Sequence, residues 1–595
     1  MITFDKPEAK QFFELSKIGT FAVSPQEDQI VFSSNISGEY ELWAMDSDSR
    51  FPYKLTSIGE NCHDLLYSKD GSFIIASFDH EGDENAQIYA LPKEGGTLKA
   101  LVQKEGQRHM IEGLSDDGHR LYYNTTDDNP TYLNSNVYDL KTGEIKTVYQ
   151  GEGAPSFLAA KNINETRFIV IKTYSNTHSV PYLFENDTLT SLVEQPDEGY
   201  AFGSAIFTSD KDLYFTTNYN QNYFYLAHYD AETKVMTKVL EKHGIDLIGL
   251  KVNQAKDTLY ITSTSGVSNE LWEYDIKNNE LEEIKIPTTQ LIQFVLSKKD
   301  TLYVAGGTAI KPINLYKATP EQRWEQLTNI TVQGIDQGYL SEPSIIHYKS
   351  FDGLEIEGLY FKARAEVDNH HLILWPHGGP QAAEVKSFRA MFQHLAYEGY
   401  SIVAPNFRGS SNYGSDFKKM VEGDWGHGPR LDNITCVDYM IEQGYAEKDK
   451  ILLMGGSYGG YMALLLHGRH PEYFKAVVDI FGVSNLFSFY DSVPEFWKPI
   501  MKQWIGDPVD DKERFTRDSP TTYLETMTKP MLVIQGANDP RVVKAESDQI
   551  VESLRAQGTD IEYIVFEDEG HGFSKKENEI TVSERVLAFF NQYIG

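Results

Sequence analysis

Short strands of alternating apolar and polar residues recur at a nearly constant spacing through the first half of the chain. Each copy opens with a small or polar residue and a turn rich in Asp, Gly, Lys or Asn, as at residues 24–32, 68–75 and 115–123. Weaker copies begin near Ala160, Ser209, Asn253 and Ser297. Successive copies start 44 to 49 residues apart, which is the length of one four-stranded propeller blade. The pattern therefore predicts a seven-bladed β-propeller over residues 19–330, with two stacked β-sandwiches as the alternative.

Aromatic residues are frequent in the second strand of these copies. They include Tyr122, Tyr123, Tyr214, Phe215, Tyr260 and Tyr303. Aromatic side chains fit the half-buried surface of a sheet, so we interpret them as core between blades and not as a ligand cage. Ahead of the repeats, residues 6–15 have the spacing of a short amphipathic helix, so residues 1–18 are expected to form an N-terminal helical segment.

The pattern changes after about residue 340, where apolar runs alternate with helical stretches. The expected strands are 372–375, 401–404, 451–454, 476–480, 531–534 and 563–566. The expected helices are 387–398, 430–443, 461–467 and 545–557. Continuous apolar strands separated by helices are typical of a parallel sheet covered on both faces. Residues 331–595 are therefore predicted to form an α/β domain, with the polar stretch 328–344 as the crossover.

Charge and composition narrow the classes of function. The 54 basic residues minus 87 acidic residues give a net charge of −33, which disfavours binding to nucleic acid or to anionic membranes. The two cysteines, Cys62 and Cys436, are too few for a disulfide framework or a zinc site, and we expect two buried thiols. The chain starts without a secretory signal pattern and has no apolar run of membrane-spanning length, so a soluble cytoplasmic protein is expected.

The sharpest local motif is Gly455-Gly456-Ser457-Tyr458-Gly459, which follows an apolar strand and precedes a helix. This G-x-S-x-G pattern in a strand–turn–helix context is typical of the nucleophile elbow of α/β-hydrolases. The glycines allow the sharp turn, and the helix N-terminus below the serine favours developing negative charge. Ser457 is the predicted nucleophile; a glycine-rich turn without catalysis is the alternative.

A serine needs a base, and in this fold an acid and a histidine follow it at the ends of later strands. Strand 531–534 leads to Asp539, and strand 563–566 leads to His571, which lies between two glycines. His571 would take the serine proton while Asp539 fixes its tautomer. The rival acids Glu567, Asp568 and Glu569 are so near His571 in sequence that we expect them to be solvated or supporting.

The negative oxygen formed during acyl transfer needs two backbone N–H donors. Tyr458, directly after the nucleophile, is expected to supply one. The other is expected in the loop Trp375-Pro-His-Gly-Gly-Pro380, from Gly379 or, failing that, Gly378. His377 is expected to shape this loop, with a role as general base as a weaker alternative. The sequence suggests no catalytic metal and no cofactor.

Together these residues resemble the prolyl oligopeptidase family of serine peptidases, and most closely its acylaminoacyl-peptidase branch. The matching pieces are 377–380, 398–400, 405–414, 455–461, 538–542 and 569–572, in the family's order; residues 409–412 read Gly-Ser-Ser-Asn where relatives often have Gly-Ser-Thr-Gly. The first half matches only as a propeller, which in this family covers the active site. The resemblance implies a seven-bladed propeller on an α/β-hydrolase domain and cleavage of short peptides.

The branch implies release of N-acylated residues from blocked peptides. Arg541 lies where relatives use an arginine on a substrate carbonyl; a surface ion pair is the alternative. Approximate matching places an apolar pocket for the residue before the cleaved bond at Val483, Leu486, Trp497, Ile500 and Met501, beside Tyr458. These positions are equally consistent with plain core. Dipeptidyl-peptidase relatives hold a free amino terminus with paired glutamates of the propeller, for which only Glu39 and Glu41 are candidates here.

Several other functions stay open at this stage. A dipeptidyl-peptidase, an oligopeptidase or a carboxypeptidase of the same family, a carboxylesterase, and a non-catalytic propeller that binds other proteins are the alternatives. A propeller of some 300 residues favours peptides over simple esters. By analogy with the family we expect a homo-oligomer, with a dimer favoured.

Overall fold

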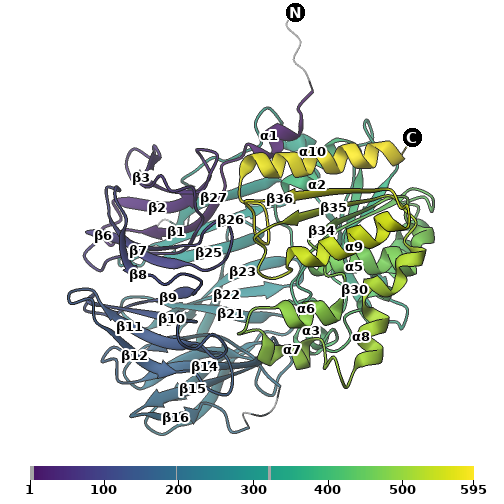
Figure 1. Ribbon diagram of the computed structural model, residues 1–595. Helices are drawn as coiled ribbons and strands as arrows, with labels where there is room; N and C mark the ends of the chain where they lie inside the picture. Colours follow the sequence, from purple (N-terminus) through teal and green to yellow (C-terminus); the bar gives the residue numbers. More distant parts are fainter. Residues whose placement is uncertain (1–5, 196, 198, 319–322, 595) are drawn as a thin grey trace, which may run out of the picture.

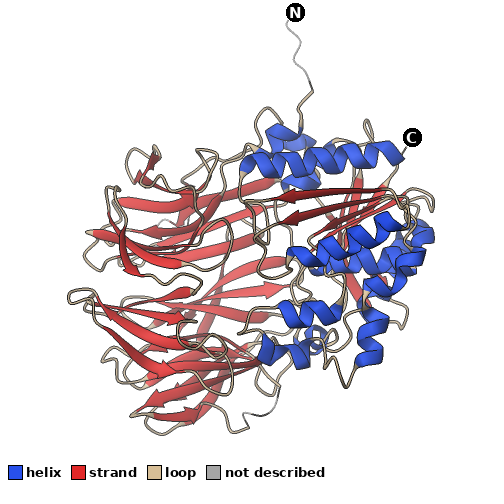
Figure 2. Cartoon of the chain, viewed as in Figure 1, coloured by secondary structure: helices blue, strands red, loops and turns tan. Residues whose placement is uncertain are grey.

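The computed structural model describes residues 6–195, 197, 199–318 and 323–594. It shows two domains that face each other: a β-rich domain from the first half of the chain and a domain of mixed helices and strands from the second half (Figures 1 and 2). The fold class expected from the sequence is confirmed.

The first domain is a propeller of seven four-stranded sheets, each made of four consecutive strands. Blades 1 to 3 consist of β1 (Ile18–Val23), β2 (Gln29–Ser34), β3 (Glu41–Asp46), β4 (Tyr53–Lys54), β5 (Cys62–Tyr67), β6 (Phe73–Phe78), β7 (Gln87–Pro92), β8 (Lys99–Val102), β9 (His109–Leu114), β10 (Arg120–Thr125), β11 (Asn134–Asp139) and β12 (Ile145–Gln150). Blades 4 and 5 consist of β13 (Ser156–Lys161), β14 (Phe168–Ser175), β15 (His178–Glu185), β16 (Thr188–Ser191), β17 (Phe202–Phe207), β18 (Asp212–Thr217), β19 (Tyr225–Asp230) and β20 (Val235–Leu240). Blades 6 and 7 consist of β21 (Asp246–Val252), β22 (Thr258–Ser265), β23 (Ser268–Asp275), β24 (Glu280–Ile284), β25 (Gln290–Leu296), β26 (Leu302–Thr308), β27 (Lys311–Ala318) and β28 (Trp324–Gln326).

The recurring start of each sequence repeat is the turn between the first two strands of a blade. In blades 1 to 3 the hydroxyl of Ser24, Ser68 or Ser115 accepts backbone N–H groups of that turn. In the later blades a serine or asparagine side chain does the same: Asn162, Ser209, Asn253 and Ser297. Short polar side chains favour such local hydrogen bonds, which explains why the repeat survives while other residues vary.

Blades 1 and 7 close the ring through side chains, because each blade keeps its own four strands. Gln293 of β25 accepts the N–H of Phe21 at 3.0 Å and donates to the carbonyl of Phe21 at 3.0 Å. Phe21 and Phe32 of blade 1 share a buried cluster with Tyr303 and Leu315 of blade 7. As expected, aromatic residues of the second strands contribute to these clusters between blades.

The second domain is built on one eight-stranded sheet in the order β29-β30-β32-β31-β33-β34-β35-β36. Its strands are β29 (Ser344–Lys349), β30 (Glu355–Phe361), β31 (Leu372–Leu374), β32 (Ser401–Pro405), β33 (Ile451–Gly456), β34 (Val477–Ile480), β35 (Met531–Gly536) and β36 (Ile561–Phe566). The six strands from β31 to β36 are parallel, as expected. The sheet is mixed, however, because β30 pairs antiparallel with both β29 and β32.

Helices cover both faces of this sheet. They are α2 (Ala390–Tyr397), α3 (Ser415–Lys419), α4 (Gly428–Glu442), α5 (Tyr458–Arg469), α6 (Leu486–Ser492), α7 (Lys498–Trp504), α8 (Lys512–Asp518), α9 (Lys544–Ala556) and α10 (Lys576–Tyr593), with 3₁₀ turns η1 (Gln337–Tyr339), η2 (Pro471–Tyr473) and η3 (Pro520–Thr526). One buried cluster joins the sheet to α4, α5 and α9, and a second joins the opposite face to α2 and α10. Neighbouring residues of one strand belong to opposite clusters, Leu453 to the first and Leu452 to the second, because strand side chains alternate between faces.

The N-terminal helix is shorter than the expected 6–15. Helix α1 spans Ala9–Phe13, and the expected residues 1–5 of the helical segment lie outside the described residues. Phe12 is fully buried, and its ring lies 5.3 Å from His394 and 5.5 Å from Tyr397 of α2. Packing against the second domain thus fixes the segment. Among the described helices, none has the length and apolarity that a bilayer crossing requires.

Candidate active site

Ser457 stands at the sharp turn between β33 and α5. Its backbone has φ 59° and ψ −122°, a conformation that costs energy for a residue with a side chain. The surrounding glycines make the turn possible: a Cβ on Gly455 would lie 2.1 Å from the carbonyl oxygen of Gly459, and a Cβ on Gly459 would lie 2.1 Å from that of Pro376. The fold therefore holds a strained serine at the carboxyl edge of the sheet, as a nucleophile elbow requires.

The structure brings Ser457, His571 and Asp539 into one hydrogen-bonded chain. Nε2 of His571 lies 2.9 Å from Oγ of Ser457, and Nδ1 of His571 lies 2.6 Å from Oδ2 of Asp539. The three residues follow β33, β36 and β35, so the carboxyl ends of parallel strands in one sheet bring them together. This geometry lets the imidazole remove the serine proton while the carboxylate orients the ring.

Asp539 is held in place by its own loop. Its Oδ1 accepts the N–H groups of Arg541 at 2.9 Å and Val542 at 3.0 Å, which leaves Oδ2 for His571. The side chain of Asp539 is fully buried. These three donors fix the position of the carboxylate beside the imidazole.

Two of the three rival acids have other partners, and the third, Glu567, is exposed. Glu569 is buried, and its two oxygens accept from the backbone N–H groups of Ser574 and Lys575, so it shapes the loop that carries His571. Asp568 pairs with Lys575. The carbonyl oxygen of Glu567 accepts from Asn538 at 3.3 Å. The expectation that these acids support the loop agrees with these contacts.

The expected N–H donors lie beside Ser457. Tyr458 is the first residue of α5, where a backbone N–H has no partner within the helix. On the facing loop, a Cβ on Gly378 would lie 3.5 Å from Cβ of Ser457, whereas Gly379 is next along the chain and has φ 126°. Gly378 thus approaches the nucleophile closely, and both glycines stay candidates for the second donor.

His377 is a structural residue of that loop. Its Nδ1 contacts the carbonyl of Gly378 at 2.7 Å, its Nε2 contacts Oγ of Ser410 at 2.8 Å, and its ring stacks on Phe407 at 4.2 Å. Burial lowers the pKa of His377 to about 4, so the ring is neutral at physiological pH. Both nitrogens are occupied, which leaves no atom to act as a general base on Ser457.

Arg541, two residues after the catalytic acid, is tied to the propeller. Its Nε donates to Oε1 of Glu84 at 2.6 Å, and Oε2 of the same carboxylate accepts from Arg108 at 3.2 Å. Glu84 therefore links one arginine of each domain. Sequence reasoning missed Glu84; its only signal is the acidic run His80-Glu-Gly-Asp-Glu84 in a turn between two strands.

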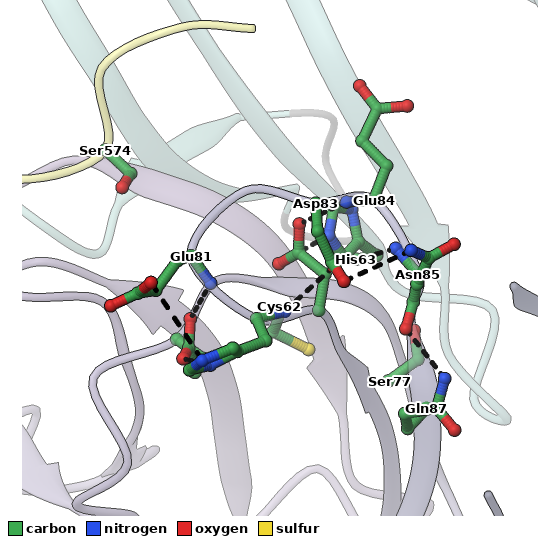
Figure 3. A network of polar contacts seen from close by, with 12 residues as sticks. Cys62, His63, Ser77, Glu81, Asp83, Glu84, Asn85, Gln87 and Ser574 are labelled. Atoms are coloured by element: carbon green, nitrogen blue, oxygen red, sulfur yellow. Dashed lines mark hydrogen bonds and ion pairs between the residues drawn. The ribbon is translucent and has the colours of Figure 1, made fainter. Parts of the chain in front are cut away.

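Glu84 belongs to the loop 79–86 between β6 and β7, called here the blade-2 loop. Figure 3 shows how Asp83 and Asn85 hold the loop together while the side chain of Glu84 points away from them. The loop rests directly on the segment that carries His571, because a Cβ on Gly82 would lie 2.8 Å from the backbone nitrogen of Gly570. The propeller thus contributes one wall of the site around the reacting residues.

The two glutamates considered as candidates for amine binding both lie beside the loop 56–59 at the end of blade 1. Both oxygens of Glu41 are used inside blade 1, where they accept from Thr56 Oγ1 and from the N–H groups of Ile58 and Gly59. Glu39 lies beside the same loop, with its Oε2 3.0 Å from the position of a Cβ on Gly59. Glu84, whose carboxylate contacts Arg541 near the catalytic acid, comes from blade 2 instead.

The five apolar residues matched to the specificity pocket lie behind Ser457 on the α5 side of the sheet. Val483, Leu486 and Met501 are at most 2% exposed and Ile500 is 8% exposed. Trp497 is half-buried and packs edge-on against Trp504 and Phe496. Phe496, which sequence matching missed, lies under the guanidinium of Arg108, 6.0 Å from ring to charge. Phe496 and Trp497 therefore connect the buried residues to Arg108 of the propeller.

Comparisons with known proteins agree with this architecture. Residues 386–595 match the family model described as prolyl oligopeptidase family, and residues 61–329 match the model of its N-terminal β-propeller domain. The chain is 36% identical to dipeptidyl peptidase family member 6 of Caenorhabditis elegans, over 98% of this chain and 86% of that protein. It is 31% identical to dipeptidyl aminopeptidase BIII of Pseudoxanthomonas mexicana, over 96% of this chain and 86% of that protein.

Solved structures share the fold at lower identity. A puromycin-hydrolyzing peptidase of Mycobacterium tuberculosis superposes with a TM-score of 0.86 at 17% identity, covering 99% of this chain and 96% of that one. The acylaminoacyl peptidase of Pyrococcus horikoshii superposes with a TM-score of 0.75 at 20% identity, covering 99% of this chain and 98% of that one. At these identities the likeness concerns the fold alone.

Proposed function

Because the chain belongs to the prolyl oligopeptidase family of serine peptidases, we propose that it is an exopeptidase that releases dipeptides from the free amino terminus of short peptides. The contact between Glu84 of the propeller and Arg541 of the hydrolase domain is the observation that carries this proposal. The two relatives that match nearly the whole chain are named as dipeptidyl peptidases, which supports it.

The reaction uses the hydrogen-bonded chain of Ser457, His571 and Asp539. Oγ of Ser457 bonds to the carbonyl carbon of the second residue while its proton passes to Nε2 of His571. The C–N bond then breaks, and the same proton goes to the leaving nitrogen, which leaves an acyl-enzyme. Water then attacks the carbonyl carbon of that ester while its proton passes to Nε2 of His571. The proton returns to Oγ of Ser457, and the dipeptide leaves with a free carboxylate. The N–H groups of Tyr458 and of Gly378 or Gly379 stabilise the negative oxygen.

Glu84 is the proposed partner of the substrate's free amino group. Each oxygen of its carboxylate is used by one arginine, Arg541 or Arg108, and each retains a second acceptor position. Burying an ammonium group is costly unless a carboxylate receives it. Because the blade-2 loop packs against the segment of His571, we expect it also to limit how many residues can precede the cleaved bond.

Release of an N-acylated residue, the function implied by the branch resemblance, is the second candidate. The side chain of Arg541 keeps 43% of its surface exposed, so its terminal N–H groups are accessible to the carbonyl of an acyl group. An acylated substrate has no charge for Glu84 to receive, so Glu84 would then only orient Arg541. The two candidates therefore differ in the role of one carboxylate.

A panel of anilides with one leaving group separates them. We expect kcat/KM for Ala-Phe-anilide to exceed the values for acetyl-Ala-Phe-anilide and acetyl-Phe-anilide at least tenfold, with the free dipeptide identified by mass spectrometry. Fastest turnover of acetyl-Phe-anilide would establish the second candidate instead. Hydrolysis of simple esters without cleavage of any anilide or peptide would contradict both and indicate a carboxylesterase.

A further inference from the structure

A cavity adjoins the reacting residues on the side away from the specificity residues. It has a volume of about 460 Å³ and lies between α2, α10, the segment after α1, and blades 1 and 7. Its lining is mostly apolar and includes Ser16, Ile313, Phe388, Phe481, Phe573 and Val582. Its size falls in the range of pockets that hold small ligands or side chains. We call it the α2–α10 cavity.

The cavity and the specificity residues lie on opposite faces of the central sheet. Phe481 and Phe573 pack with the cluster of α2 and α10, whereas Val483 and Met501 pack with the cluster of α5 and α9. The chain crosses from one face to the other between Phe481 and Val483. Ser457, at the strand edge, therefore has one apolar region on each side.

The cavity reaches the reacting residues themselves. Gly456, which precedes the nucleophile, forms part of its wall. Phe481 forms the rim: it lines the cavity, and its ring centroid lies 4.6 Å from that of His571. Phe573, two residues after His571, packs against the ring of Phe481 at 5.8 Å. A group bound in the cavity would thus lie next to the imidazole.

Proton transfer decides which half of a substrate belongs there. Nε2 of His571 gives its proton to the leaving nitrogen, so that nitrogen must lie on the imidazole side of Ser457. The acyl part lies on the other side, toward Arg541 and the specificity residues. The residue that follows the cleaved bond is then directed toward the α2–α10 cavity.

We propose that the α2–α10 cavity binds the side chain of the first residue of the leaving peptide and selects a large apolar, preferably aromatic, side chain. This inference rests on the proposed peptidase function and adds the specificity on the leaving side. Burying an apolar or aromatic side chain in such a cavity is favourable. The two cations of its lining, Lys17 and Arg389, are already paired with Glu579 and Glu384, so a carboxylate there would have to compete for them. A small side chain such as glycine would leave the cavity unfilled.

One polar corner refines the preference. Oε1 of Glu579 pairs with Lys17, but Oε2 is buried and has no hydrogen-bond partner among the described residues. Both residues line the cavity, as does Tyr40. A tyrosine hydroxyl or tryptophan N–H that enters the cavity could donate to this oxygen. Tyrosine and tryptophan are therefore expected to be accepted alongside phenylalanine and leucine.

The test is a peptide series Ala-Phe-Xaa-Ala-amide that varies only the residue after the cleaved bond. With wild-type protein we expect kcat/KM for Xaa = Phe, Tyr or Leu to exceed that for Gly or Asp at least tenfold. Ser16→Phe narrows the cavity from a loop and should reduce this ratio below threefold. Ile313→Ala widens it and should raise the rate for Trp relative to Leu.

Val509→Phe is the matched control, because it adds the same ring at a position that is 80% exposed and does not line the cavity. This variant should keep the wild-type ratio of kcat/KM between the peptides with a large apolar residue and those with Gly or Asp. Labelling of Ser457 by a fluorophosphonate probe at the wild-type rate shows that each variant is folded and reactive. Rates that vary less than twofold across the series, or a Ser16→Phe variant that slows all peptides equally relative to the control, would overturn the proposal.

The test of the α2–α10 cavity does not depend on which acyl part the enzyme prefers. If acetylated substrates are preferred, the proposed dipeptide release fails, and the same series is measured with the acetyl-Phe-Xaa-Ala-amide peptides. If no peptide is cleaved, benzyl and methyl esters with one common acyl part replace them. A preference for the benzyl ester that Ser16→Phe removes would then support the cavity, and equal rates would contradict it.

Discussion

The two sides of Ser457 differ in chemistry and in origin. On one side, Arg541, Arg108 and Glu84 bring three charges together, and two of these residues come from the propeller. On the other side, the α2–α10 cavity is mostly apolar and is built from helices, the N-terminal segment and blades 1 and 7. A site that is charged at one end and mostly apolar at the other favours one direction of a bound peptide. In the proposed binding mode the propeller therefore contributes to recognition on both sides and also covers the site.

The largest expected effect on activity comes from replacing Ser457 or His571, which lie between the two sides. Ser457→Ala or His571→Ala should lower kcat at least about a thousandfold on every substrate, because each removes the nucleophile or its base. Steady-state rates on Ala-Phe-anilide and loss of fluorophosphonate labelling in Ser457→Ala measure this. A loss of tenfold or less would mean that other residues carry the reaction.

Glu84→Gln tests the charged side. Replacing a carboxylate that binds an ammonium should cost about 1.5–3 kcal/mol, or roughly tenfold to a hundredfold in kcat/KM, on Ala-Phe-anilide. The acetylated anilide should change less than threefold. Glu94→Gln, an exposed position of the same blade, is the matched control. Equal losses on free and acetylated substrates would assign Glu84 only to the orientation of Arg541.

Gly82→Ala tests whether the blade-2 loop acts through its contact with the catalytic segment. Gly82 has φ +76°, and an added Cβ would meet the backbone of Gly570, so the loop must move. We expect kcat/KM to fall several-fold. Gly106→Ala is matched, because Gly106 has φ +69° and nothing within 4 Å of the added Cβ. If both variants keep wild-type rates, the position of the loop does not matter for catalysis.

His394 of α2 is expected to have a smaller, pH-dependent effect on folding stability. It is buried between α2 and α10, where Nδ1 contacts Oγ of Ser583 at 2.8 Å. Burial, and to a lesser extent Lys6, lowers the pKa of His394 from 6.5 to about 4. Below pH 6.5 the unfolded chain takes up a proton that the folded protein does not. Above pH 6.5 neutral His394 therefore costs no folding stability. As the pH falls from 6.5 toward 4, the free energy of unfolding decreases by up to about 1.4 kcal/mol per pH unit.

His394→Gln removes that titration. Between pH 7 and pH 5 the Tm of the wild-type protein should fall further than the Tm of the variant. Thermal unfolding of both proteins at the two pH values provides the comparison. A parallel decrease would mean that His394 is protonated in the folded state.

Much of the fold, and the three residues of the hydrogen-bonded triad, could be predicted from the sequence because their signals are local. The propeller follows from a repeated turn, and Ser457, Asp539 and His571 each follow a strand in a motif of a few residues. The mixed character of the sheet was missed, because nothing in strand β30 records the direction of its partners. Long-range packing alone positions Glu84 and Ser16 at the site, so neither could be singled out from its neighbours in sequence.

The central claim is that Ser457 is acylated by a dipeptide whose amino group is free. Its most direct test is the mass of the acyl-enzyme, trapped by acid quench within the first turnovers of Ala-Phe thioester and mapped by proteolysis. We predict a mass increase equal to one Ala-Phe acyl group on the peptide that contains Ser457, at a higher occupancy than acetyl-Ala-Phe thioester gives. An adduct on another residue, or one formed only by the acetylated compound, would contradict the account.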